Sequence, residues 1–252
     1  MQLTDKWVVG FVDGDGCFKI INAKTGKRYC FVVSQDKRSV NVLYALKKKF
    51  GCGSVNKVGK NMREYRVSSK KDLIEIILPF FEKNPLQTEK LKDFQILYED
   101  LTDKKLLLPG KTICRDWLTG FIDAEANFHV SMVKNYPRPQ FVIGLHLKEK
   151  EILESIQNWM RSFTNSNYSG GTVYEKKKKN GSNYLVYQIS SLTGFLEIIK
   201  VCTTNTNRCL LKTSKRIDFL KFKQIIRIIQ QKRHLTDNGI LIIKKIQQKL
   251  VV

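Results

Sequence analysis

W-V-V-G-F-V-D-G-D-G-C-F, at residues 7–18, returns at residues 117–128 as W-L-T-G-F-I-D-A-E-A-N-F. Each copy is an apolar run of helical type that ends with a small residue between two carboxylates and continues into a strand of alternating residues. Trp, Gly, Phe, a β-branched residue, Asp, a second acid and Phe recur in fixed register. Two carboxylates are therefore expected at each of two equivalent helix ends.

The repeat extends well beyond this stretch. A constant offset of 110 relates the two copies as far as residue 50, and later Y-R-V-S-S at 65–69 matches Y-Q-I-S-S at 187–191. The pattern predicts an α+β fold of two units, each with the order αββαββα and an antiparallel sheet. The expected units are 1–102 and 116–252, joined by a linker at 103–115, and the second unit carries an extra C-terminal helix at 237–250. A single helix is expected at 71–81.

The charge balance points to a polyanionic partner. The chain has 252 residues, and 45 Lys and Arg against 23 Asp and Glu give a formal charge of +22. A positively charged surface of this kind favours binding to nucleic acid, because binding releases condensed counterions from the phosphates. We expect no membrane role, because the sequence has no apolar run near 18 residues and no lipidation signal. Six cysteines without metal-type spacing, and a first helix where a leader would stand, favour a reducing compartment with no targeting signal.

The predicted strands alternate polar and apolar residues, so one face of each sheet is expected to lie on helices and the other to be exposed. Arg, Lys, Asn, Gln and Ser on an exposed face are the residue types that pair with base edges in a major groove. In the first unit the expected DNA-binding residues are Lys19, Ile21, Arg28, Asn56, Glu64, Arg66 and Ser68. In the second unit they are Asn127, His129, Ser131, Arg138, Gln140, Tyr174, Gln188 and Ser190.

The two motif helices are predicted to touch each other. Gly10 and Gly120, each three residues before the first acid of its motif, let two helix backbones come close. Asp15 and Glu125 would then emerge together. Carboxylates at helix C-termini oppose the helix dipole and repel each other unless a cation lies between them, and oxygen-only ligation suits Mg²⁺.

Both stretches resemble the LAGLIDADG motif of homing endonucleases and intron maturases. G-F-V-D-G-D-G fits it closely, and G-F-I-D-A-E-A fits with Glu for the last Asp and Ala for the last Gly. P-L-x-T-x-K at 85–90, with a counterpart at 211–215, and H-L-T-x-x-G-I at 234–240 also resemble the family. The resemblance implies a homing-endonuclease fold, with two pseudo-twofold related units whose sheets form a DNA-binding saddle.

The resemblance also implies roles for individual residues. The last acid of each motif, Asp15 or Glu125, would ligate the metal, with the carbonyls of Gly14 and Ala124 assisting, whereas Asp13 and Asp123 would finish the helices. Trp7 and Trp117 are expected in the core. Polar residues expected around the scissile phosphates are Gln35, Lys212 and Gln87. The two halves differ here, because Leu145 stands opposite Gln35 and Gln87 stands opposite Lys212.

The activity implied is metal-dependent hydrolysis of both strands of a long asymmetric DNA site by a monomer, in support of intron mobility. Mg²⁺ is the expected cation, Mn²⁺ would substitute for it, and Ca²⁺ would bind without supporting cleavage. The alternative is a maturase of the same fold that binds intron RNA and assists splicing. The family association and the Lys-, Ile- and Asn-rich composition suggest a gene within a chloroplast or mitochondrion.

Overall fold

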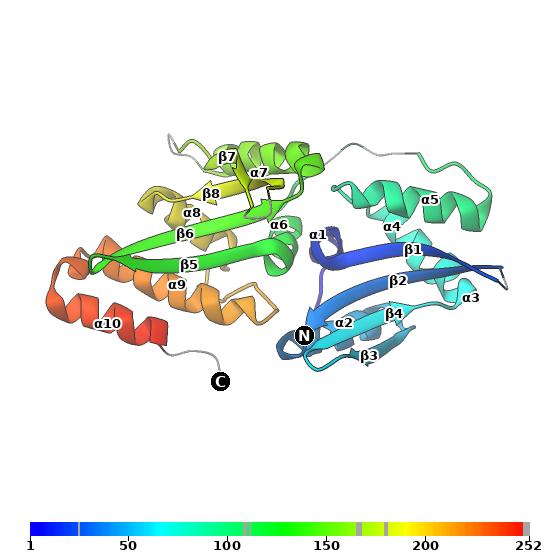
Figure 1. The fold of residues 1–252 in the computed structure, drawn as a ribbon, viewed down its shortest axis with the longest axis horizontal. Coiled ribbons are helices and arrows are strands. Elements are labelled where there is room, and N and C mark those ends of the chain that lie inside the picture. The colour runs from blue at the N-terminus through cyan, green and yellow to red at the C-terminus, as the bar shows by residue number, and fades with distance from the viewer. Residues whose placement is uncertain (25, 108–109, 111, 165–167, 179–180, 249–252) are drawn as a thin grey trace. The chain divides into compact units, whose positions relative to one another are not determined.

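The computed structural model describes residues 1–24, 26–107, 110, 112–164, 168–178 and 181–248. Its contacts divide the chain into two compact units, Met1–Glu125 and Ala126–Val252 (Figure 1). The predicted boundaries at 102 and 116 follow the repeat and stay a prediction. The contacts group the second motif helix, α6 (Arg115–Glu125), with α1 (Asp5–Asp15) in the first unit.

The first unit holds a four-stranded antiparallel sheet in the order β1-β2-β4-β3. Its strands are β1 (Gly16–Ala23), β2 (Gly26–Asp36), β3 (Ser54–Val58) and β4 (Met62–Val67). Its other helices are η1 (Lys37–Ser39), α2 (Val40–Phe50), α3 (Lys70–Asp72), η2 (Leu73–Ile77), α4 (Leu78–Lys83) and α5 (Lys90–Thr102). Residue 25, between β1 and β2 in the sequence, lies outside the described residues, as do residues 108, 109 and 111 of the predicted linker.

The second unit repeats the arrangement with the sheet order β5-β6-β8-β7. Its strands are β5 (Ala126–Val133), β6 (Tyr136–Leu145), β7 (Thr172–Lys177) and β8 (Asn183–Ile189). Its helices are η3 (Leu147–Glu149), α7 (Lys150–Phe163), α8 (Leu192–Val201), α9 (Lys215–Gln230), η4 (Arg233–Leu235) and α10 (Asp237–Gln248). With α6 as the first helix of the second copy, the predicted α+β class and the duplicated αββαββα order are confirmed. The last part of the predicted terminal helix, 249–250, lies outside the described residues.

The helix predicted at 71–81 is not uniform. Its middle, η2, is a π-helical turn in which the N–H of Leu78 donates to the carbonyl of Leu73, five residues earlier. Pro79 follows at once and has no N–H to continue an α-helical ladder. The corresponding helix of the second unit, α8, contains no proline and is a regular α-helix. The wider turn thus accompanies the proline.

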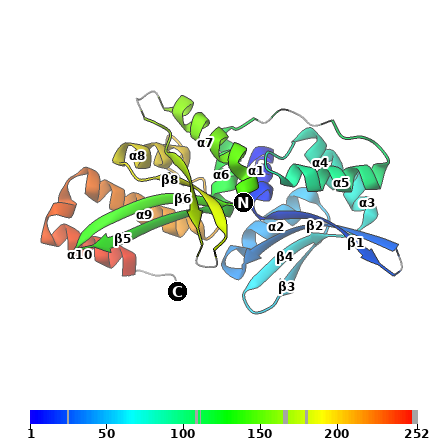
Figure 2. The same cartoon turned by 45° about the horizontal axis from the view of Figure 1, so that its top comes forward.

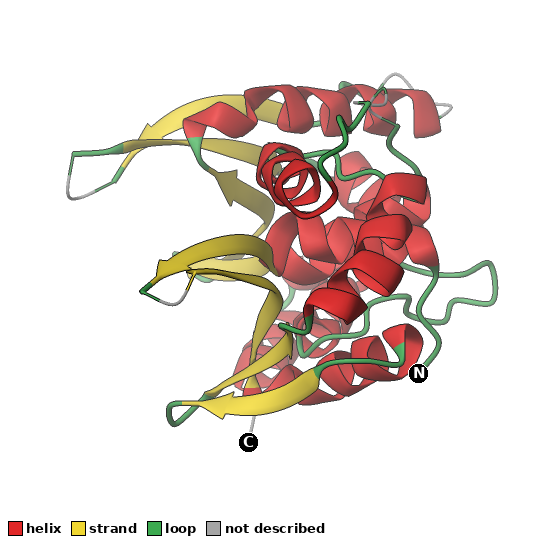
Figure 3. Cartoon of the chain, turned by 90° about the vertical axis from the view of Figure 1, so that its right-hand side faces the viewer, coloured by secondary structure: helices red, strands yellow, loops and turns green. Residues whose placement is uncertain are grey.

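In each unit the helices cover one face of the sheet and leave the other open (Figure 3). Aromatic side chains fill the covered side. In the first unit Phe18 stacks on Phe31 and meets the edges of Phe81 and Phe94, with ring centroids 5.0–5.3 Å apart. In the second unit the equivalent Phe128 lies against Phe141, Phe219 and Phe222. In the first strand of each unit, successive side chains therefore point alternately to the covered face and to the open face of the sheet.

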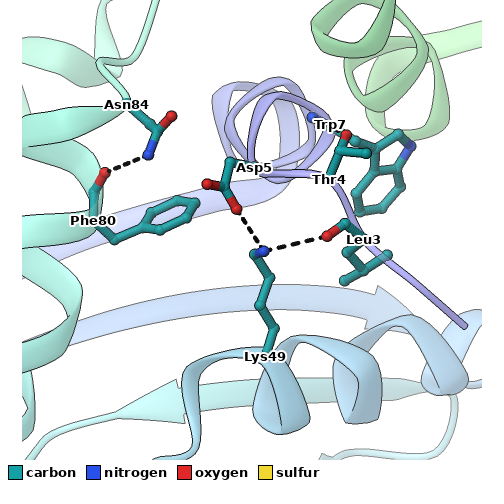
Figure 4. A network of polar contacts seen from close by, with 7 residues as sticks. All are labelled: Leu3, Thr4, Asp5, Trp7, Lys49, Phe80 and Asn84. Carbon is teal, nitrogen blue, oxygen red and sulfur yellow. Dashed lines mark hydrogen bonds and ion pairs between the residues drawn. The ribbon is translucent and has the colours of Figure 1, made fainter.

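The N-terminus of α1 is fixed before the motif begins. Thr4 caps the helix by accepting a hydrogen bond from the N–H of Trp7. Lys49 of α2 donates to the carbonyl of Leu3 and pairs with Asp5 at 2.6 Å (Figure 4). These contacts set the direction in which α1 carries its acidic end.

Two further features of the described residues concern membrane helices and cysteines. No helix among the residues that the structure describes is long and apolar enough to cross a membrane. The six cysteines are free thiols, two of them buried.

Candidate active site

The motif helices α1 and α6 touch through their glycines. A Cβ at Gly10 would lie 1.9 Å from the carbonyl oxygen of Trp117, and one at Gly120 would lie 2.0 Å from that of Trp7. Real Cβ atoms do not come so close to a carbonyl, so only glycine allows this backbone contact. The close approach predicted from the two glycines is confirmed, and it brings the two acidic helix ends together.

Asp13 is a buried hub and does more than finish α1. Its carboxylate accepts hydrogen bonds from the N–H groups of Gln87 and Thr88 at 3.0 Å, from the Thr88 hydroxyl at 2.7 Å, and from the Trp117 indole at 2.7 Å. Burial raises the pKa of Asp13, although these hydrogen bonds act in the opposite direction. The residue thus joins α1 to α6 and to the segment that leads into α5.

The indole of each motif tryptophan donates a hydrogen bond to the first motif acid of the other helix. The Trp7 indole donates to Asp123 at 3.2 Å, as the Trp117 indole donates to Asp13. Both tryptophans are at most 2% exposed, which confirms that they belong to the core. Their role as hydrogen-bond donors was not predicted. The signal in the sequence was the fixed spacing of one Trp and one Asp in both copies of the motif.

The second acids of the motif are half-buried and close to each other. A Cβ built on Gly14 would lie 3.4 Å from Oε1 of Glu125, so this carboxylate reaches the end of α1 that carries Asp15. Gln35, at the end of β2, donates a hydrogen bond from Nε2 to Oδ2 of Asp15. The structure therefore brings together the side chains of three predicted site residues, Asp15, Glu125 and Gln35.

Lys90, at the start of α5, completes this cluster and was not predicted as a site residue. Its ammonium donates to the Gly14 carbonyl and lies 3.4 Å from the carbonyl of Val12. Burial lowers the pKa of Lys90, while Glu125, Asp15 and Asp13 act to raise it. It ends the P-L-x-T-x-K pattern at 85–90, which was the only signal for it in a lysine-rich chain.

The donors of this cluster suit a hard cation. Asp15 and Glu125 offer carboxylate oxygens, and no group of three or more His, Cys, Asp or Glu suited to a metal occurs in the described part of the chain. Mg²⁺ is commonly held by one or two carboxylates and completes its shell with waters and substrate phosphates. Two acids at adjoining helix ends fit that requirement, so these two residues can hold such an ion.

The other predicted residues of the centre are placed less simply. Gln87 is 4% exposed, and its amide donates to the Pro85 carbonyl at 2.8 Å and accepts from the N–H of Thr112 at 2.6 Å. This amide thus joins the segment before α5 to the segment after it, and the catalytic assignment of Gln87 stays a prediction. Lys212 lies in the second unit on the segment before α9, and its assignment also stays a prediction. So do the metal-ligand roles of the Gly14 and Ala124 carbonyls.

The open face of the first sheet carries the residues predicted to read DNA. Strand register sets Ile21 opposite Arg28, and Glu64 opposite both Ser34 and Asn56. By the same alternation Lys19 and Arg66 point to this face, and Ser68 follows the end of β4. Arg66 pairs with Glu64 at 2.7 Å. The floor between these polar groups is apolar, because Cys30 and Val32 are 2% and 3% exposed.

A hollow of about 730 Å³ lies at the hairpin end of this face. Four predicted residues line it, namely Ile21, Arg28, Arg66 and Ser68. Lys70 also lines it and was not predicted, because nothing in the sequence separates it from other surface lysines. Lys27 and Tyr29 border the hollow at the edge of the hairpin, although their side chains turn to α5. Three or more cations around one concavity favour an anionic ligand.

The open face of the second sheet has the same organisation. Register places His129 opposite Gln140 and Ser131 opposite Arg138. Tyr174 donates from its hydroxyl to the Gln188 amide oxygen at 2.6 Å. Asn127 shares this face, and Ser190 follows β8 and is exposed. None of the predicted residues is buried, and their contacts with DNA stay a prediction. Residues 179 and 180, in the lysine-rich run between β7 and β8, lie outside the described part.

Comparisons with known proteins identify the family. The model of the LAGLIDADG endonuclease family matches residues 8–99 and 118–226. The probable intron-encoded endonuclease Cox1-I1b of Schizosaccharomyces pombe is 28% identical over 225 residues, and the match covers 71% of this chain but 58% of the relative. The intron-encoded RNA maturase bI4 of Saccharomyces cerevisiae is 27% identical, and the match covers 84% of this chain but 30% of the maturase.

The fold is also shared with a solved structure. The LAGLIDADG homing endonuclease I-GzeII in complex with its DNA target superimposes with a TM-score of 0.83 at 22% identity, covering 99% of both chains. At this identity the likeness is one of fold. The family model, however, matches the motif and the sheet in both halves of the sequence. The protein belongs to the LAGLIDADG endonuclease family.

Proposed function

We propose that this protein is a site-specific DNA endonuclease that hydrolyses one phosphodiester bond on each strand of a long double-stranded site. The observation that carries the proposal is the pair of carboxylates, Asp15 and Glu125, at the adjoining ends of α1 and α6, with Gln35 and Lys90 beside them. Family membership and the DNA-bound I-GzeII structure support the class of substrate.

The protein groups would divide the work at the scissile phosphates. Asp15 and Glu125 would hold divalent cations, Mg²⁺ or Mn²⁺ for cleavage, with Ca²⁺ bound but inactive. A bound cation of this kind polarises the phosphate and lowers the pKa of a water. The hydrogen bond from Gln35 fixes the orientation of the Asp15 carboxylate. Lys90 offers a positive charge next to both acids, where negative charge grows in the transition state. Lys212 is proposed to balance charge in the same way.

The open sheet faces would supply affinity and selectivity. Their polar residues include Arg28, Arg66 and Arg138, which suit bidentate contacts with guanine. The two faces carry different residues at equivalent positions, such as Ile21 and Ser131. A single chain of two unlike halves would therefore act as a monomer on an asymmetric site.

The biological setting follows from the relatives. Cox1-I1b is named as intron-encoded, and the present chain would likewise promote the mobility of an intron within an organelle gene. A maturase is the second candidate, because the match to maturase bI4 covers most of this chain. A maturase would bind the precursor RNA of its own intron and increase its splicing.

A cleavage assay tests the proposal. Intron-less and intron-containing forms of the host gene are incubated with the protein in Mg²⁺ and in chelator. We expect a double-strand cut in the intron-less allele only, and only with Mg²⁺. If neither allele is cut while splicing of the intron RNA increases, the maturase function is correct and the endonuclease function is wrong.

A further inference from the structure

In each unit the hairpin of the first two strands, β1 and β2 or β5 and β6, is held by side-chain contacts to a helix on the covered side of the sheet. We call each set of contacts a hairpin tie. In the first unit Asp100, near the C-terminus of α5, accepts hydrogen bonds from Lys27 and from the Tyr29 hydroxyl, the latter at 2.6 Å. Both donors belong to β2 close to its turn with β1. One carboxylate therefore joins the hairpin to the last turns of α5.

The residue between the two donors points the other way. Successive side chains of a strand alternate, so Lys27 and Tyr29 face α5 while Arg28 faces the open side. Arg28 lies opposite Ile21 of β1, and both line the hollow of the open face. Asp100 thus holds the strand on either side of a residue that is proposed to contact DNA.

The second unit ties the equivalent hairpin by different chemistry. Ile225 of α9, with Ile228 and two isoleucines of α10, forms an apolar cluster against which Val130 and Met132 of β5 pack. Gln247 of α10 also donates to the Val130 carbonyl at 2.6 Å. Figures 1 and 2 both show α10 beside the hairpin of β5 and β6.

The two ties act on equivalent places. Val130 and Met132 flank Ser131, which lies opposite Arg138. At the offset of 110, Ser131 and Arg138 correspond to Ile21 and Arg28. The offset of 125 that relates Asp93 to Asp218 also relates Asp100 to Ile225. One helix position thus carries a carboxylate in one copy and a buried isoleucine in the other.

We propose that Asp100 is a positioning residue for DNA recognition, which fixes the hairpin of β1 and β2 so that Arg28 meets its base pairs, and that Ile225 has this role in the second unit. The proposal rests on the proposed DNA-binding function. The first tie is ionic and exposed, so salt screens it, whereas the second is apolar and salt leaves it intact.

The test compares mismatch penalties along the target. Affinity in Ca²⁺ is measured for wild type, Arg28→Ala, Asp100→Ala and Asp100→Asn on targets with single base-pair substitutions. A mismatch at a contacted pair lowers affinity by about 5- to 150-fold. Base pairs at which the mismatch penalty is smaller for Arg28→Ala than for wild type are the positions that the hairpin contacts. In Asp100→Ala we expect lower penalties at those same positions and unchanged penalties elsewhere, with Asp100→Asn intermediate because Tyr29 keeps an acceptor.

Two controls separate positioning from stability. Asp93→Ala removes an exposed acid from the same helix and should leave every penalty unchanged. The cleavage rate at saturating DNA should be unchanged in Asp100→Ala. A uniform loss of affinity at all positions, or unchanged penalties at the Arg28 positions, would overturn the proposal.

Amide hydrogen exchange tests the tie without DNA. The hairpin amides of residues 28–30 should exchange faster in Asp100→Ala than in Asp93→Ala, and equal rates would overturn the tie itself. Failure of the wild-type protein to bind duplex DNA would instead remove the proposed function, and with it the recognition role, whatever the exchange rates.

Discussion

Replacing Asp13 with alanine should destabilise the protein strongly, although Asp13 is not proposed to touch metal or substrate. The change removes the acceptor of four buried donors, the N–H groups of Gln87 and Thr88, the Thr88 hydroxyl and the Trp117 indole. Each unsatisfied buried donor costs about 1–3 kcal/mol. The lower value applies, because removing a buried carboxylate also relieves its desolvation, and the expected loss is about 4 kcal/mol.

Urea unfolding followed by tryptophan fluorescence and circular dichroism measures this loss. With a slope of about 3 kcal/mol per molar, the midpoint should fall by about 1.3 M. Asp15→Asn is the matched control, since it changes the neighbouring acid of the same motif. It should leave the free energy of unfolding within about 0.5 kcal/mol, because Asp15 is half-buried and lies close to a second carboxylate. A loss under about 1 kcal/mol for Asp13→Ala, or an equal loss for Asp15→Asn, would refute this reasoning.

Further predictions concern the helix contact, the metal centre and the sheet face. Gly10→Ala places a Cβ 1.9 Å from the Trp117 carbonyl, so the helices must separate and the melting temperature should fall by several degrees; an unchanged melting temperature would contradict the contact. Asp15→Asn and Glu125→Gln should bind the target in Ca²⁺ and fail to cut it in Mg²⁺; cleavage by either variant would show that the metal assignment is wrong. Arg66→Ala should lose about 1–3 kcal/mol of discrimination at one base pair, whereas an equal loss on all sequences would mean that Arg66 contacts phosphate. The contacts of Asp100 with the hairpin of β1 and β2 should be lost in acid. The pKa of Asp100 lies below the usual range because of the hydrogen bonds from Lys27 and Tyr29, so the contacts are complete above an ordinary aspartate pKa and are lost as pH falls through the lowered value. Hydrogen exchange of residues 28–30 can follow this loss.

The repeated motif was sufficient to predict much of the fold. Its internal offset predicted two αββαββα units, and the alternation of β1 and β5 predicted which residues lie on the open faces. These inferences hold because periodicity and glycine spacing are local properties of a sequence. Gly10 and Gly120 are a clear case, since only the smallest residue permits the observed backbone contact.

The uneven helix at 70–83 shows where local reasoning fell short. Its residues have helical periodicity throughout, so the sequence predicted one helix. The π-helical turn before Pro79 depends on how the chain accommodates a missing N–H, and periodicity does not report that choice.

What the sequence by itself determined is the identity of the two helix ends: the repeat marked Asp15 and Glu125 as equivalent, and the two motif glycines predicted that their helices meet. What only the tertiary structure decided is the use of the residues around them. Asp13 became a buried hub for donors 74 and 104 residues away, Lys90 came to lie beside both acids, and Asp100 tied down a hairpin more than 70 residues earlier. The physical reason is that a hydrogen bond between distant segments depends on where the whole fold places each donor, and no local pattern in the chain carries that information.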